Sequence, residues 1–110
     1  MKRVLFVDVR NAAGSQIARA LYERRGGEAR SAGSDPAEDV DGAVVEALEE
    51  IGVDLSVRRP RALADADLEW ADVVVSIEED WNLPDPVGLC LEEVRELRAV
   101  IEAHIAGLPG

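Results

Sequence analysis

Few side chains in this sequence are able to do chemistry, and the best placed of them is a carboxylate. Cys90 is the only cysteine and His104 the only histidine, which excludes an internal disulfide, a paired-cysteine metal site and a histidine-based metal site. We therefore expect neither a metal nor a cofactor. The best-placed candidate is Asp8, which directly follows the apolar run at residues 4–7 and precedes a helical pattern.

Two interpretations of Asp8 are open. A carboxylate can act as a phospho-accepting nucleophile, as carboxylates do in some ATPases. Alternatively, it accepts hydrogen bonds from backbone amides at the start of the following helix and has a structural role. The sequence favours the structural role, because neither a second aspartate nor an evident magnesium site accompanies Asp8.

Alternating strand and helix patterns position this residue. Residues 4–7 form a continuous apolar run, which is typical of a strand buried on both faces. Apolar residues at helical spacing follow, and glycines end the helices. The pattern predicts strands at 4–7, 28–32 and 73–77, and helices from Ser15 to the glycines at 26–27, over 44–51, over 64–70, and from Leu91 to Gly107.

This alternation predicts an α/β fold, a three-layer sandwich with helices on both faces of a parallel sheet. We expect a flavodoxin-like sheet of three to four strands in the order 2-1-3-4, with the first strand central. The loop at residues 8–15 then lies at the topological switch point, where open α/β folds bind ligands. The 110 residues are expected to form a single domain, 1–110.

The residues of this loop and several later segments resemble one known family. Residues 4–21, VLFVDVRNAAGSQIARAL, are similar to the phosphate-binding loop and first helix of the low-molecular-weight protein tyrosine phosphatases and the thioredoxin- or mycothiol-coupled arsenate reductases. The later segments that resemble this family, in the same order, are SAGS at 31–34, GVDLS at 52–56, PRAL at 60–63, ADVVV at 71–75 and WNLPDP at 81–86.

The resemblance implies an anion-binding loop made of Asp8, Val9, Arg10, Asn11, Ala12, Ala13, Gly14 and Ser15. In the family, a cysteine thiolate at the end of the strand attacks, an arginine clamps the oxyanion, and an aspartate before a proline protonates the leaving oxygen. Here Asp8 stands at the cysteine position and Gly14 at the arginine position. Asn11 and Ser15 are retained and can organise the loop. Asp85 stands at the general-acid position, although a plain turn residue before the proline is the favoured interpretation.

The paired loss at Asp8 and Gly14 predicts a pseudoenzyme: a catalytically impaired or inactive phosphatase- or arsenate-reductase-like protein whose loop is structural or binds an oxyanion. One alternative is a slow phosphatase-type hydrolase that uses Asp8 and Asp85. Another is a protein-binding module with no anion site, which presents Trp70 and Trp81 to a partner. Arsenate reduction by a thiol cascade is not expected. Family reductases carry further cysteines before the Trp–Asp-Pro segment, whereas here only Glu78, Glu79 and Asp80 separate Ile77 from Trp81.

The charge of the chain bears on its partners. The formal net charge is −11, and Lys2 is the only lysine. Such a surface repels nucleic acid and anionic membranes, so we expect neither as a partner. A phosphate-like anion or a protein partner stays open, and a cytoplasmic location is expected. We further expect Arg10 to be solvated, rather than paired with Asp8 or bound to an anion, and Cys90 to serve in packing. His104 is expected to serve in packing or to complement the dipole at the end of the last helix, rather than in catalysis.

Overall fold

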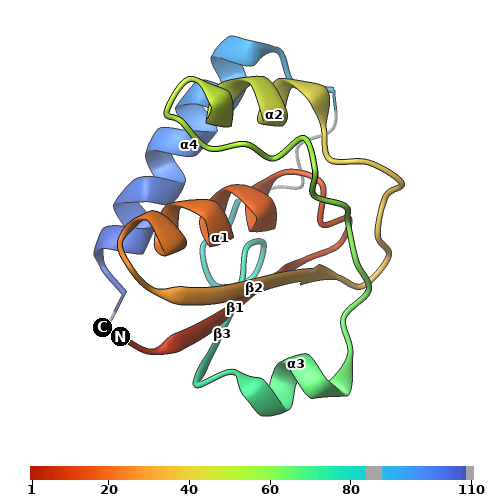
Figure 1. Ribbon diagram of the computed structural model, residues 1–110, viewed down its shortest axis with the longest axis vertical. Helices are drawn as coiled ribbons and strands as arrows, with labels where there is room; N and C mark the ends of the chain where they lie inside the picture. The colour runs from red at the N-terminus through yellow and green to blue at the C-terminus, as the bar shows by residue number, and fades with distance from the viewer. Residues whose placement is uncertain (84–87, 109–110) are drawn as a thin grey trace.

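Three parallel strands and four helices make up the part of the chain that the computed structural model describes, residues 1–83 and 88–108 (Figure 1). In chain order the elements are β1 (Arg3–Asp8), α1 (Gly14–Arg24), β2 (Glu28–Gly33), α2 (Gly42–Glu49), α3 (Asp65–Trp70), β3 (Val73–Ser76) and α4 (Leu91–Ala106). Each predicted strand and helix is present within a few residues of its expected bounds.

The sheet has the order β2-β1-β3, so the first strand is central as predicted. β1 pairs in parallel with β2 from Arg3↔Glu28 to Asp8↔Gly33, and with β3 from Val4↔Val73 to Val7↔Ser76. Within the described residues the sheet has three strands, the lower of the two numbers expected. Because β1 carries apolar residues on both of its faces, it belongs in the middle of the sheet.

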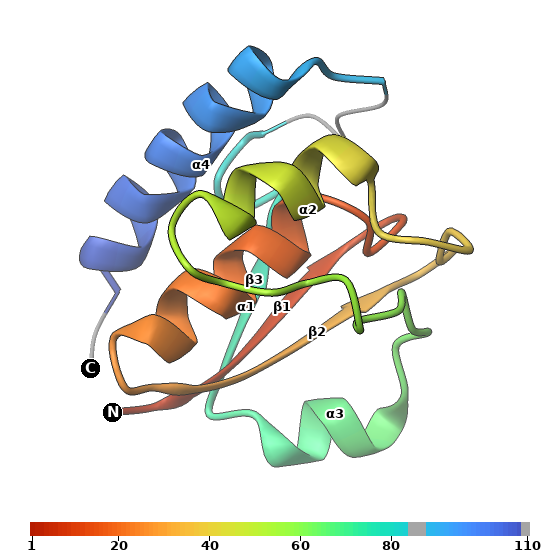
Figure 2. The same cartoon turned by 45° about the horizontal axis from the view of Figure 1, so that its top comes forward.

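Helices lie on both faces of the sheet, as Figures 1 and 2 show: α1, α2 and α4 on one side and the short α3 on the other. Val4 and Phe6 of β1 join the main apolar core together with Val75. The residues that the three larger helices contribute to this core are Ile17, Ala18, Ala20, Leu21, Tyr22, Val44, Ala47, Leu48, Val94, Ile101 and Ile105. The face toward α3 is less completely covered, since Val74 remains 43% exposed there.

The last helix is tied to the sheet through aromatic rings. His104 of α4 stacks on Trp81 with ring centroids 4.8 Å apart, and Trp81 in turn lies 5.7 Å from Phe6. The packing role predicted for His104 is therefore confirmed. None of the helices in the described part of the chain is long and apolar enough to cross a lipid bilayer.

Candidate functional site

The loop at residues 8–15 leaves the carboxyl end of the central strand and leads directly into α1 (Figure 1). This is the switch-point position that the strand order predicts. Asp8, Asn11, Ala13, Gly14 and Ser15 are buried, Ala12 is half-buried, and Val9 and Arg10 are exposed. The loop therefore turns most of its side chains inward and offers little polar surface to a ligand.

Asp8 fills the centre of the loop with its own carboxylate. Its Oδ1 accepts a hydrogen bond from the Asn11 amide at 2.8 Å, and its Oδ2 accepts one from the Ser15 amide at 3.0 Å. Backbone amides at the start of a helix are natural donors to anions. This is the structural role that the sequence favoured for Asp8.

Asn11 connects the loop to distant parts of the chain. It is fully buried and adopts a left-handed backbone with φ of 51°, a conformation that asparagine tolerates better than most residues. Its Nδ2 donates to the Ser15 hydroxyl at 2.8 Å, and its Oδ1 accepts from the Arg61 amide at 3.0 Å. Gln16 Nε2 donates to both the carbonyl and the Oδ1 of Asn11, each at 3.1 Å. Sequence reasoning missed Gln16 and Arg61, because the sequence contains no signal that pairs them with Asn11.

Gly33, at the end of β2, allows the loop to approach the sheet closely. A Cβ at this position would lie 2.6 Å from the Val9 carbonyl oxygen and 3.0 Å from the Asn11 nitrogen. The following amide, that of Ser34, donates to the Asp8 carbonyl at 3.1 Å. Any larger residue at Gly33 would have to displace backbone, so the absence of a side chain here sets the position of the loop.

Gly14 stands where the resembling family has its arginine, and the space for that side chain is now partly filled. A Cβ built on Gly14 would lie 3.0 Å from Cγ2 of Ile77. A side chain at this position therefore requires Ile77 to shift by a few tenths of an ångström. Ile77 thus occupies part of the space that a side chain at position 14 would need.

The remaining predicted residues contribute less. The side chain of Arg10 is exposed, as expected for a solvated arginine. Asp85 lies outside the described residues. The packing role predicted for Cys90 is wrong: this cysteine is exposed just before α4, where no other element covers it within the described part of the chain.

A hollow of about 320 Å³ lies beside the loop, on the side of β3. It is lined by Val7, Asp8, Val9, Ser34, Leu63, Ser76, Glu78 and Glu79. Three of these side chains carry carboxyl groups and none is basic. Such a wall opposes the approach of a phosphate-type dianion, because like charges repel most strongly where water is partly excluded.

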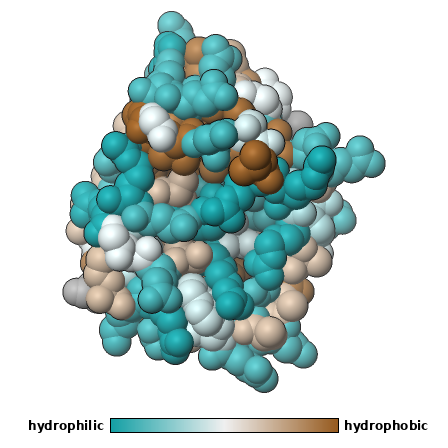
Figure 3. Space-filling model, in the orientation of Figure 1, coloured by the Kyte–Doolittle hydropathy of each residue, from teal (hydrophilic) through white to brown (hydrophobic). Residues whose placement is uncertain are grey.

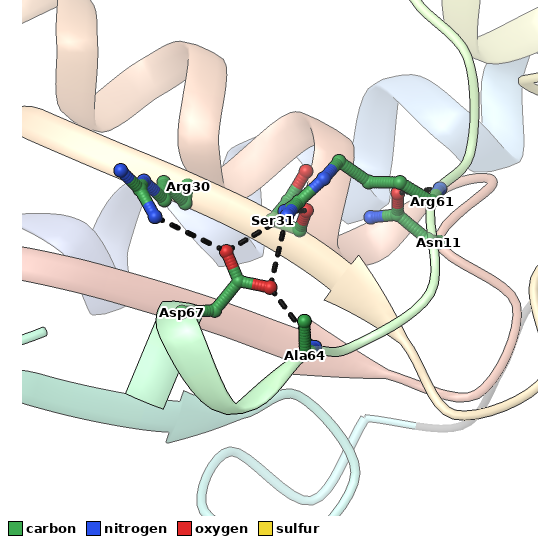
Figure 4. A network of polar contacts seen from close by, with 6 residues as sticks. All are labelled: Asn11, Arg30, Ser31, Arg61, Ala64 and Asp67. Carbon is green, nitrogen blue, oxygen red and sulfur yellow. Dashed lines mark hydrogen bonds and ion pairs between the residues drawn. The ribbon is translucent and has the colours of Figure 1, made fainter. Parts of the chain in front are cut away.

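An ion-pair network anchors the segment that runs beside the loop (Figure 4). Asp67 of α3 is 1% exposed and accepts from Nη2 of Arg61 through both of its oxygens, at 2.7 and 2.9 Å. It also accepts from Arg30 Nη1 at 3.3 Å and from the Ala64 amide at 3.1 Å. Arg61 Nη1 reaches the Ser31 carbonyl at 2.9 Å, which holds the segment against β2.

Replacing Asp67 by asparagine is expected to lower the free energy of unfolding at neutral pH by about 1.5–3 kcal/mol, the range for hydrogen bonds to charged groups. Burial alone would raise the pKa of Asp67, but hydrogen bonds from Arg61 and the Ala64 amide, with the charge of Arg61, hold this pKa below its usual range. A lowered pKa stabilises the fold above the unfolded-state value, and this stabilisation is lost as the pH falls through the folded-state value.

Urea unfolding at a series of pH values checks this prediction, and the difference between the wild type and Asp67→Asn should shrink below about pH 4. Asp39→Asn is the matched control, because Asp39 and Arg59 form a surface pair whose side chains are 76% and 78% exposed. That substitution should change stability by no more than about 0.5 kcal/mol. Equal effects of the two substitutions would contradict a structural role for the network.

Comparisons with known proteins agree with this geometry. The profile of the family described as low molecular weight phosphotyrosine protein phosphatase matches residues 3–80. A Halobacterium salinarum protein described as "Putative arsenate reductase" is 36% identical, over 94% of this chain and 87% of its own length.

Solved structures of similar proteins share the fold over nearly the whole chain. An arsenate reductase in the oxidized state superimposes with a TM-score of 0.83 at 27% identity, covering 98% of this chain and 96% of its own. The YwlE arginine phosphatase from Geobacillus stearothermophilus gives 0.82 at 25% identity, covering 96% and 89%. With its central strand, its strand-to-helix loop and a match over residues 3–80, the chain belongs to the low molecular weight phosphotyrosine protein phosphatase family.

Proposed function

We propose that this chain is a non-catalytic member of its family, a pseudophosphatase whose 8–15 loop is closed by its own Asp8. The observation that carries the proposal is the pair of hydrogen bonds, at 2.8 and 3.0 Å, from the Asn11 and Ser15 amides to the two oxygens of Asp8. These are donors of the kind that an oxyanion needs in such a loop. A bound phosphate would have to displace the carboxylate and then lie next to it.

The chemistry that remains in the loop also supports the proposal. Without a thiolate at position 8, the covalent route through a phosphocysteine is absent. Without an arginine at position 14, one contact to the transition-state charge is lost, which typically raises the barrier by about 2.7–4 kcal/mol. The two losses act on different parts of the reaction, so neither residue compensates for the other.

Reduction of arsenate, the activity named for several relatives, is not part of this proposal. A thiol cascade passes an oxidised sulfur from one cysteine to the next. Cys90, the only cysteine, precedes α4 and does not lie at the end of β1. A single cysteine also cannot form an internal disulfide.

The two alternatives have less support. A slow hydrolase would need Asp8 as nucleophile, but both oxygens of Asp8 already accept hydrogen bonds from amides. A protein-binding module that presents tryptophans has weaker grounds as well. The Trp70 ring lies 4.4 Å from the Arg30 guanidinium, and Trp81 stacks on His104. Both rings are half-buried in the protein itself.

Hydrolysis of p-nitrophenyl phosphate tests the proposal. We expect the wild-type protein to release p-nitrophenol no faster than the Asp8→Ala variant at any pH at which both are folded. The Arg95→Gln variant, purified in the same way, reports contamination by other phosphatases, because Arg95 lies on α4 and pairs with Glu50 rather than with the loop. Turnover by the wild type that disappears in Asp8→Ala would overturn the proposal and favour the slow hydrolase.

A further inference from the structure

A second pocket, of about 320 Å³, lies between α1, β2 and the segment that leads from α2 to α3. In Figure 2 this segment crosses over α1 and runs beside the end of β2, where the Gly33 amide donates to the Arg61 carbonyl at 2.9 Å. The pocket is lined by Gln16, Arg19, Ala29, Arg30, Ser31, Arg58, Arg59 and Arg61. None of the lining residues belongs to the 8–15 loop.

The charge of this pocket is opposite to that of the protein as a whole. Five of the 12 cationic side chains line it, although the chain carries a net charge of −11. The space-filling view in Figure 3 shows a mainly hydrophilic face, with apolar residues gathered near α2. No carboxylate belongs to the described lining residues.

Nearby carboxylates neutralise only part of this charge. Among the described residues, ion pairs join Arg19 to Glu23, Arg30 and Arg61 to Asp67, and Arg59 to Asp39. Three carboxylates therefore face five guanidinium groups, which leaves a surplus of two positive charges. Burial lowers the pKa of Arg19, Glu23 raises it, and the nearby charge of Arg58 lowers it again. Arg19 and Arg58 also line a neighbouring hollow together with Glu23 and Asp54, whose carboxylates offset part of this repulsion.

Two buried polar atoms at the pocket lack hydrogen-bond partners within the described part of the chain. Arg19 is 5% exposed, and its Nη2 has no acceptor; Gln16 is 2% exposed, and its Oε1 has no donor. Gln16 cannot exchange the two ends of its amide, because its Nε2 already donates to Asn11 twice. Buried groups of this kind are rare in folded proteins and are costly when nothing satisfies them. Neither atom is exposed to solvent in this conformation, so a ligand in the pocket reaches them only when the side chains of Gln16 and Arg19 turn toward it.

We propose that this pocket binds free hydrogen phosphate. The unprotonated oxygens accept from Arg19 Nη2 and from the exposed Arg58, as guanidinium groups and phosphates commonly pair. The one P–OH of hydrogen phosphate donates to Gln16 Oε1. An oxyanion with both acceptors and one donor satisfies the two orphaned atoms at once, which a fully deprotonated oxyanion does not.

Titration of the ¹⁵N-labelled full-length protein tests this site. We expect inorganic phosphate to shift the amides of Arg30, Ser31 and residues 58–61 and the Arg19 side chain in a saturable way at millimolar or lower concentration. Sodium chloride at matched ionic strength should not. Sulfate, which has no proton to donate to Gln16 near neutral pH, should bind more weakly than phosphate. Phenyl phosphate, a phosphomonoester that is mostly a dianion without a P–OH near neutral pH, should also bind more weakly than phosphate.

Variants separate this site from the rest of the surface. Arg58→Gln removes one exposed donor with little risk to the fold, and Arg19→Met removes the buried one. Each should weaken phosphate binding by about tenfold or more. Arg95→Gln is the control, because Arg95 pairs with Glu50, just after α2, and takes no part in the pocket. It should bind phosphate like the wild type.

The site does not exist if no saturable shift is seen in the millimolar range, or if sulfate binds as tightly as phosphate. It is also overturned if Arg58→Gln and Arg19→Met bind like Arg95→Gln. Shifts confined to residues 9–15 would overturn it too, and would at the same time contradict the closed loop. The residue-by-residue readout therefore separates the failure of this inference from the failure of the proposed function.

Discussion

The Asp8→Ala variant is expected to unfold more easily than the wild type by about 2–5 kcal/mol, because two buried amide donors lose their acceptors. The donors are the backbone N–H groups of Asn11 and Ser15, whose nitrogens lie 2.8 and 3.0 Å from the carboxylate oxygens of Asp8. Water cannot easily replace the carboxylate, since Asp8 itself is only 7% exposed. Urea unfolding in buffer free of phosphate measures the loss. Asp8→Asn retains one acceptor oxygen and should show an intermediate loss.

The same substitution should open the loop to oxyanions. Once the carboxylate is gone, the amides of Asn11 and Ser15 are available to hold a phosphate, and binding to the folded state raises stability by mass action. Phosphate should therefore stabilise Asp8→Ala more than the wild type. The comparison isolates the loop, because the arginine pocket is unchanged in both proteins. NMR supplies the local readout: the amides of 9–15 shift on phosphate addition in Asp8→Ala and not in the wild type.

Two results would contradict this account of Asp8. One is an Asp8→Ala variant as stable as the wild type, which would mean that the two hydrogen bonds contribute nothing. The other is a wild-type loop whose amides respond to phosphate as strongly as those of the variant. In that case the carboxylate does not close the loop, and the phosphatase family's usual anion site is still open.

Restoring both lost residues is expected to produce the largest gain of function available in this chain. In the Asp8→Cys/Gly14→Arg variant, a thiol surrounded by amides at a helix start ionises readily. Its sulfur attacks the phosphorus of p-nitrophenyl phosphate, p-nitrophenolate leaves, and water then releases phosphate from the phosphocysteine. The arginine should raise the rate about 10²–10³-fold over Asp8→Cys alone, the usual contribution of one transition-state contact. A burst of p-nitrophenolate followed by slower turnover is the expected signature.

Ile77 is the obstacle to this restoration. Because a Cβ at position 14 would lie 3.0 Å from Ile77 Cγ2, the new arginine has to displace a buried side chain. Adding Ile77→Ala removes the contact and should increase activity further, at a loss of stability of about 2–5 kcal/mol for the truncated core residue. Asp8→Ser/Gly14→Arg is the matched control, because it has the arginine but no thiolate, and it should be inactive.

Failure of the restored proteins would be informative if they are folded. A triple variant with a native-like NMR spectrum and no hydrolysis would mean that the loop no longer has the geometry of the family's active members. The two carboxyl groups that remain in the hollow beside the loop, those of Glu78 and Glu79, would then be the next barrier to remove.

The sequence by itself determined the order of the elements and the place of the loop. The continuous apolar run at residues 4–7 indicates a strand that is covered on both faces. The helical spacing of apolar residues in the later segments indicates the helices around it. Once the first strand is central, the loop that follows it must lie at the switch point. The sequence also showed that positions 8 and 14 carry neither a thiol nor a guanidinium group. This matters because the side-chain type decides whether a residue can act as a nucleophile or clamp an oxyanion.

Burial of single residues was less accessible to sequence reasoning. Cys90 was expected to pack and is exposed, whereas His104 packs on Trp81 as expected. His104 lies on the inward side of a long helix, so the helical periodicity of the apolar residues around it indicates that its side chain is packed. Cys90 lies just before a helix, where periodicity does not apply and only the neighbouring elements decide what is covered.

Only the tertiary structure decided what the inward-facing polar groups do. The hydrogen bonds of Asp8 depend on how the loop folds back, and those of Asn11 depend on a partner 50 residues away, Arg61. The arginine pocket is built from α1, β2 and the segment before α3, which meet because β2 is an edge strand and leaves room for that segment beside it. Arginines that look like scattered surface charges in the sequence become one site in this way, since charge acts through distance in space and not through separation along the chain.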